Sequence, residues 1–139
     1  AANVCKKKIV EVGMREELSV CEAPIMKIIW ESNPDISVPE LVKQLNEQYG
    51  KEYARTTVVT FLTRMAGKGY ITTQRRGRIS YVHAIKSEQE YKQQLAQKEI
   101  EFWFHGSMAE FAQTLCAAAP LTHEECQKLR RLLDHVEEK

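Results

Sequence analysis

The sequence lacks most features that mark secreted, membrane-spanning or disulfide-stabilised proteins. Its 139 residues include only four cysteines, far apart and without a Cys-x-Cys or Cys-x-x-Cys pair. A small disulfide scaffold would contain more cysteines, and a structural zinc site would have paired ligands at short spacing. No apolar run is long enough to cross a bilayer, and no apolar segment follows the basic residues 6–8 as in a secretory signal. We therefore expect a cytoplasmic protein.

Signatures of catalysis are also missing. There is no glycine-rich phosphate loop and no Gly-x-Ser-x-Gly motif. The four histidines fall in no recognised catalytic or metal-binding motif. We predict no enzymatic activity, no metal site and no cofactor. In a reducing compartment Cys21, Cys116 and Cys126 should pack as small apolar side chains. The alternative is a thiol- or metal-responsive site formed by Cys116 and Cys126.

The chain does contain regularly placed signals for helix starts. With 43% apolar and 28% charged residues it has the composition of a globular protein. Ser/Thr-x-x-Glu, the sequence of a helix-capping box, occurs four times before an apolar rhythm, at Ser19, Ser37, Ser87 and Thr122. We expect helices over about 20–32 and 38–49, the second ending at Gly50, and a short strand at Ile36 between them.

The next segment combines a third helix with a hairpin. Over residues 55–67 apolar side chains recur at helical spacing (Val58, Phe61, Leu62, Met65), and Gly69 should end this helix. Threonines and a valine fall on the opposite side. Residues 70–74 and 79–84 then read as two strands joined through Arg76 and Gly77. This order, three helices and a hairpin, is that of a winged helix-turn-helix domain.

Positive charge is concentrated in the same segment. Residues 51–85 hold seven Lys/Arg and one acid, a net charge of +6, whereas the whole chain sums to +1. Such a patch predicts binding to a phosphate backbone, with about six phosphate contacts and strong salt dependence. Arg55 is the candidate for guanine, and the threonines and Val59 for other base edges. The full predicted DNA-binding set is Arg55, Thr56, Thr57, Val59, Thr60, Thr63, Arg64, Lys68, Arg75, Arg76 and Arg78.

Beyond Ser87 the sequence indicates a helical tail that needs a partner. A long helical pattern covers 87–118, with a break expected at Gly106–Ser107, and a last helix begins at Thr122. Three consecutive aromatics, 102–104, cannot all face one small domain. A second copy of the chain is the expected cover, which would place two reading helices on a palindromic operator. The predicted dimerisation residues are Leu95, Phe102, Trp103, Phe111, Leu115, Leu129, Leu132, Leu133 and Val136.

These predictions define a mainly α fold with a small β-hairpin wing and three regions. Residues 1–17 should be a flexible N-terminal extension. Residues 18–86 should form the winged helix-turn-helix domain, and residues 87–139 the C-terminal dimerisation helices. A rival interpretation is an adaptor that uses a winged helix to dock on proteins and does not bind DNA.

The chain resembles the penicillinase-repressor family (BlaI/MecI/CopY) in four segments that span most of its length. They are Ile25–Trp30, Arg55–Met65, Lys68–Ile71 and Leu121–Glu125. The resemblance implies a winged-helix repressor that dimerises through its C-terminal helices and blocks transcription from promoters with inverted repeats. It also implies that Thr56, Thr57, Thr60 and Arg64 face DNA. Val59 stands where some family members carry an arginine.

The resemblance does not extend to the family's two known triggers. Copper-responsive members end in paired Cys-x-Cys motifs, whereas this chain ends Val-Glu-Glu-Lys. Members that respond to β-lactams are cleaved at an Asn–Phe bond, and this chain contains no such pair; Lys98–Glu99 aligns loosely with that position. The sequence therefore predicts neither copper sensing nor proteolytic control by those routes, and a regulatory protease partner stays an open question.

Overall fold

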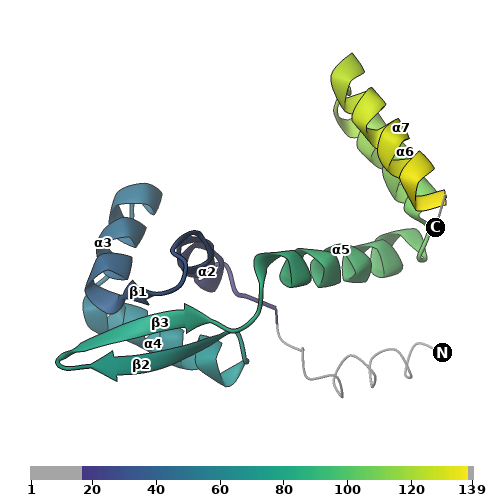
Figure 1. Cartoon of the computed structure of the whole chain (residues 1–139). Helices are drawn as coiled ribbons and strands as arrows, with labels where there is room; N and C mark the ends of the chain where they lie inside the picture. Colours follow the sequence, from purple (N-terminus) through teal and green to yellow (C-terminus); the bar gives the residue numbers. More distant parts are fainter. Residues whose placement is uncertain (1–16, 138–139) are drawn as a thin grey trace. The chain divides into compact units, whose positions relative to one another are not determined.

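The computed structural model describes residues 17–137, which form two compact units that divide after Gln93 (Figure 1). Nearly all of the predicted N-terminal extension lies outside the described residues, as do Cys5 and residues 138–139. The first unit contains α2 (Glu22–Glu31), β1 (Ile36–Ser37), α3 (Val38–Tyr49), α4 (Arg55–Gly67), β2 (Ile71–Arg76) and β3 (Ile79–Ala84). The fold is a winged helix-turn-helix followed by helices, as the sequence predicts. Between residues 17 and 137 no helix is long and apolar enough to cross a membrane.

Hydroxyl caps start the helices at the predicted places. Ser19 and Glu22 form a complete capping box: the Ser19 hydroxyl accepts from the Glu22 N–H (3.2 Å), and the Glu22 carboxylate accepts from the Ser19 N–H (2.8 Å). The side chains of Ser37, Ser87 and Thr122 accept from the N–H groups three residues later. Each cap satisfies a backbone donor that a helix N-terminus otherwise leaves unpaired. The local sequence therefore determines where these helices begin.

The core of the first unit is formed where α2, α3 and α4 meet the sheet. The stripe predicted on α4 points inward: Val58, Leu62 and Met65 are buried, and Phe61 is half-buried. They pack with buried residues of the neighbouring elements, including Ile25 and Met26 of α2 and Leu41 and Leu45 of α3. Tyr49, which continues the α3 spacing, is 40% exposed, because it lies at the last residue of the helix, beyond this core.

An amide clamp fixes the turn between α3 and α4. The Asn46 side chain donates to the Tyr53 carbonyl (3.2 Å) and accepts from the Tyr53 N–H (3.0 Å). The Tyr53 ring then packs edge-on against Phe61 of α4, with centroids 5.6 Å apart. Both backbone groups of a loop residue are thereby paired within the protein, which holds α4 at a defined angle to α3.

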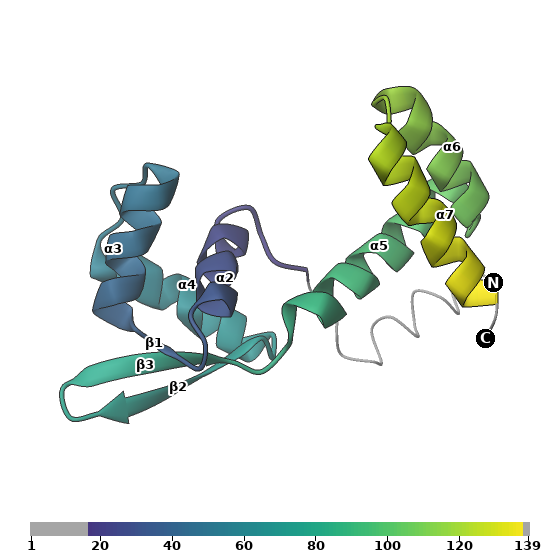
Figure 2. The same ribbon diagram turned by 45° about the horizontal axis from the view of Figure 1, so that its top comes forward.

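Strands β2 and β3 form the wing, and β1 adds a third strand in the order β1-β3-β2, all antiparallel. Arg76 pairs with Ile79, so the turn consists of Gly77 and Arg78 rather than the predicted Arg76 and Gly77. Gly77 has φ of +67°, and no positive φ occurs at Arg78, which is the pattern of a type II′ turn with glycine first. The hairpin tip extends beyond α2, α3 and α4 in both views (Figures 1 and 2).

The remaining helices are α5 (Glu88–Phe104), α6 (Met108–Ala118) and α7 (His123–Glu137). The predicted break after α5 is confirmed, and its cause is two successive residues with positive φ, His105 (51°) and Gly106 (81°). Ser107 then caps α6 by accepting from the Glu110 N–H (3.1 Å). This fifth Ser-x-x-Glu was present in the sequence, and it is the signal that fixes the restart of the helix. Helices α6 and α7 lie side by side (Figures 1 and 2).

Candidate nucleic-acid interface

The outward face of α4 collects seven of the predicted DNA-binding residues. Val58, Leu62 and Met65 turn inward, so the rest of the helix circumference is left at the surface. With a step of about 100° per residue, Thr56, Thr60 and Thr63 fall opposite the buried stripe. Val59 and Arg55 flank them on one side, and Thr57 and Arg64 on the other. All seven side chains are exposed: Arg55, Thr56, Thr57, Val59, Thr60, Thr63 and Arg64.

The N-terminus of α4 differs from the other helix starts. Ala54 occupies the N-cap position and has no side chain to cap the helix, and the first turn contains no acid. Instead Arg55 places a cation at the positive end of the helix dipole, an arrangement that costs stability unless an anion binds there. A helix start that lacks a capping side chain and carries a cation, and that lies at the surface, favours a role in binding an anion over a structural role.

The wing carries three arginines with different environments. Arg76 forms an ion pair with Asp35 (2.6 Å) and lies over the Tyr81 ring, 4.5 Å from its centroid. Arg75 donates from Nε to the Gly77 carbonyl (3.2 Å). Arg78, in the turn itself, is exposed and makes no ion pair with residues 17–137. Arg76 therefore anchors the wing to the loop before β1, while Arg75 and Arg78 present charge at its tip.

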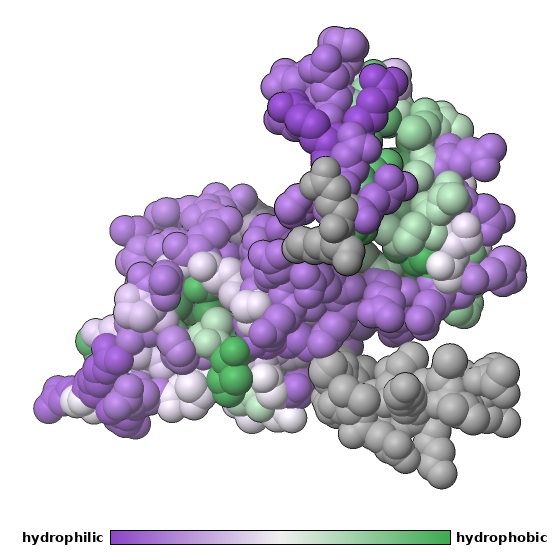
Figure 3. All heavy atoms as spheres, turned by 45° about the vertical axis from the view of Figure 1, so that its right-hand side comes forward, coloured by the Kyte–Doolittle hydropathy of each residue, from purple (hydrophilic) through white to green (hydrophobic). Residues whose placement is uncertain are grey.

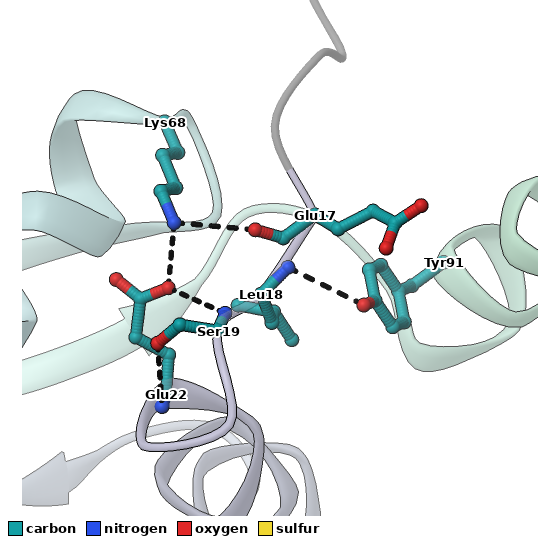
Figure 4. A network of polar contacts seen from close by, with 6 residues as sticks. All are labelled: Glu17, Leu18, Ser19, Glu22, Lys68 and Tyr91. Atoms are coloured by element: carbon teal, nitrogen blue, oxygen red, sulfur yellow. Dashed lines mark hydrogen bonds and ion pairs between the residues drawn. The ribbon is translucent and has the colours of Figure 1, made fainter.

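The Lys68 side chain points into an internal network of polar contacts (Figure 4). Its Nζ lies 2.6 Å from the Glu22 carboxylate, which is 1% exposed, and it also donates to the Glu17 carbonyl (3.2 Å). Burial alone would raise the pKa of Glu22, but the hydrogen bonds from Lys68 and Ser19 outweigh burial and hold that pKa below its ordinary value of 4.5. Lys68 thus neutralises a buried charge and links the end of α4 to the start of α2.

The same network reaches α5. The Tyr91 hydroxyl accepts from the Leu18 N–H (3.4 Å) (Figure 4). The Tyr91 ring packs against Trp30 (centroids 5.8 Å apart) and Tyr70 (5.7 Å). The first turn of α5 therefore packs as part of the winged-helix unit. This packing could not be predicted from local sequence patterns, because Tyr91 is separated from its partners by at least 21 positions along the chain.

The tail unit leaves most of its apolar side chains uncovered. From residue 94 to 137 only Ile100 is buried, and α6 and α7 have no buried residue. Apolar atoms gather on the surface of these helices (Figure 3). Of the predicted dimerisation residues, Leu95 and Phe111 are half-buried, and the following are 43–71% exposed: Phe102, Trp103, Leu115, Leu129, Leu132, Leu133 and Val136.

The cysteines are not all packed as expected. Cys21 and Cys126 are half-buried, but Cys116 is exposed in the single chain, because it lies on the uncovered surface of α6. The Cys21 thiol lies 3.9 Å from the Tyr53 hydroxyl, and this hydrogen bond raises the pKa of Tyr53. Residues 17–137 contain no group of three or more potential metal ligands.

Comparison with known proteins assigns the chain to a family. A family model described as penicillinase repressor matches residues 18–135. The methicillin resistance regulatory protein MecI of Staphylococcus aureus (strain N315) is 23% identical over 118 residues, which cover 85% of this chain and 94% of MecI. MecI of Mammaliicoccus sciuri is 22% identical over the same length.

Two solved structures are similar to parts of the chain. The DNA-binding domain of the repressor BlaI, determined in solution, has a TM-score of 0.46 and 27% identity, and covers 52% of this chain and 85% of that domain. HlyU from Vibrio cholerae N16961 has a TM-score of 0.46 and 14% identity, and covers 69% of this chain and 92% of HlyU.

Proposed function

Since the chain belongs to the penicillinase-repressor family, a family of DNA-binding transcriptional repressors, we propose that it acts as a homodimer on an inverted-repeat operator. In this proposal α4 enters the major groove, and the tip of the β2–β3 wing contacts the flanking backbone. The protein would work in the cytoplasm, without cofactor or catalysis.

The observation that carries the proposal is the outward face of α4. One helix exposes threonines, a valine and two arginines on the side opposite the core, and its uncapped N-terminus leaves backbone donors available. Residues near the N-terminus of a recognition helix are the ones that reach base edges. We assign Arg55, Thr56, Thr57, Val59 and Thr60 to bases. Arg64, Arg75 and Arg78 are assigned to phosphates, and Arg76 and Lys68 to holding the elements in place.

The homodimer is supported by the uncovered tail. Large apolar side chains on α5, α6 and α7 are 43–71% exposed, and clustered exposed apolar side chains mark protein–protein contact sites. A second copy buries the same surface on both chains with one twofold axis. Two copies of α4 related by that axis would require two half-sites in opposite orientation.

The experiment that tests the function is selection of bound sequences from a random duplex library by the purified full-length protein. We expect an inverted repeat whose half-sites are separated by about one helical turn. Sedimentation of the selected duplex with the protein should give two chains per duplex. Recovery of unrelated sequences, with no retardation of any duplex at low salt, would contradict the proposal and favour the protein-docking adaptor.

A further inference from the structure

The reading face of α4 offers methyl groups where a helix that reads guanine offers hydrogen-bond donors. Val59 is 42% exposed in the middle of an otherwise polar surface. The two threonines that follow it do not present their hydroxyl protons outward. The Thr60 hydroxyl donates to the Thr56 carbonyl (3.0 Å), and the Thr63 hydroxyl donates to the Val59 carbonyl (2.9 Å).

These two hydrogen bonds determine what the threonines can recognise. A hydroxyl has one proton, so a threonine that donates to the carbonyl four residues earlier has no donor left for a base. It retains oxygen lone pairs that accept, and its γ-methyl group occupies another staggered position on the same Cβ. Val59, Thr60 and Thr63 together therefore present methyl groups and acceptors.

The four base pairs differ in how well they match this surface. In the major groove guanine presents two acceptors, O6 and N7, which need donors from the protein. Thymine presents its 5-methyl group, and the paired adenine presents the N6 amino donor. A surface of methyl groups and acceptors matches an A·T pair and fails to match a guanine. Two long donors flank this surface: Arg55, at the N-terminus of α4, lies on the Val59 side, and Arg64 lies on the opposite side.

Resting on the proposed function, we propose that Val59, Thr60 and Thr63 select A·T pairs through the thymine 5-methyl group, with Val59 as the main specificity-determining residue. A guanine read by Arg55 would lie beside this A·T segment in each half-site. The position that carries an arginine in some relatives would thus have exchanged donor-based readout for methyl-based readout in this chain.

The test replaces thymine by uracil, which removes only the 5-methyl group. Fluorescence anisotropy at fixed salt compares the selected operator with duplexes in which each thymine in turn is uracil. At one or two positions in each half-site we expect a loss of about fourfold, the value for one buried methyl group. The Val59→Ala variant should bind the thymine and uracil duplexes equally at the position that Val59 reads. Circular dichroism melting checks that this exposed substitution leaves the fold intact.

Two further arms make the result specific. Arg78→Ala serves as the matched control, because it should weaken all duplexes alike and leave the thymine-to-uracil ratio unchanged. Replacing the A·T pair by a G·C pair should lose affinity, and 5-methylcytosine in that pair should restore part of it.

Equal affinities for thymine and uracil at every position, in a protein that still prefers its operator to random duplex, would overturn the methyl readout alone. Absence of any operator preference would instead count against the proposed function itself.

Discussion

At the scale of single residues, the basic side chains predicted to contact DNA include some that are paired with acids and some that are not. Lys68 and Arg76 are engaged by acids of the same unit, Glu22 and Asp35, at 2.6 Å each. Arg55, Arg64 and Arg78 form no ion pair within residues 17–137. Net charge along the sequence therefore overstates the charge available to DNA, and the free arginines are those that lie on α4 and at the wing turn.

The first residue-scale prediction concerns Lys68. Lys68→Met removes the partner of a carboxylate that is 1% exposed, and an uncompensated buried charge costs about 3 kcal/mol of unfolding free energy. Urea unfolding followed by circular dichroism measures the loss. Lys27→Met is the matched control, because the Lys27–Glu88 pair (3.4 Å) is largely open to solvent, at 46% and 31% exposed, and should contribute little. Equal effects of the two substitutions would mean that the Glu22–Lys68 pair has no special structural role.

The second residue-scale prediction concerns Arg78. Arg78→Ala should weaken binding to operator and to random duplex by the same factor, because a phosphate contact carries no sequence information. The slope of log affinity against log salt should become shallower by about one for each subunit. Lys128→Ala, on α7, is the control and should leave both quantities unchanged. A loss confined to the operator would instead place Arg78 on a base.

At the scale of elements, short-range signals explain most of what the sequence predicts. Capping residues, apolar spacing and glycine positions locate α2, α3, α4 and both strands of the wing, because each depends on neighbours only a few residues away. Long-range pairs are different. Three contacts depend on the tertiary fold and cannot be predicted from the local sequence pattern: the clamp from Asn46 to Tyr53, the Glu22–Lys68 pair and the packing of Tyr91. The shift of the wing turn to Gly77–Arg78 reflects the need for glycine first in a type II′ turn.

At the level of helices and strands, we predict the effect of removing the Asn46 clamp. Asn46→Ala leaves the N–H and carbonyl of Tyr53 without their partners and should lower the unfolding free energy by about 1–3 kcal/mol. Because the clamp also sets the angle of α4, operator affinity should fall further than random-duplex affinity. Gln48→Ala, exposed on the same helix, is the control for thermal melting and DNA titration. Unchanged operator preference in a destabilised Asn46→Ala protein would show that the clamp stabilises the fold without orienting the helix.

At the scale of the whole molecule, the proposed homodimer rests on apolar side chains of the tail helices that a single chain leaves exposed. Helices α6 and α7 have no buried residue, although the leucines and valine of α7 recur at helical spacing. A single chain would leave this stripe in water, and the hydrophobic effect favours its burial against an identical stripe. Dimerisation would also place two winged-helix units on one operator, so the binding free energies of their contacts would combine.

The whole-molecule prediction uses the two most exposed members of the stripe. Leu133 and Val136 are 62% and 60% exposed, so the Leu133→Asp/Val136→Asp protein should still fold. It should sediment as a monomer and lose operator binding, while its affinity for short random duplex at low salt stays close to that of one wild-type subunit. Arg131→Asp, on the opposite side of α7, controls for added negative charge. A doubly substituted protein that remains dimeric would place the subunit interface elsewhere.

The most direct measurement of the central claim is backbone amide chemical-shift mapping of the full-length protein during titration with its selected duplex. We expect the largest shifts at Arg55–Arg64 of α4 and at Arg75–Arg78 of the wing, with α6 and α7 unchanged between free and bound protein. Shifts concentrated on other surfaces, with the amides of α4 unaffected, would contradict the account.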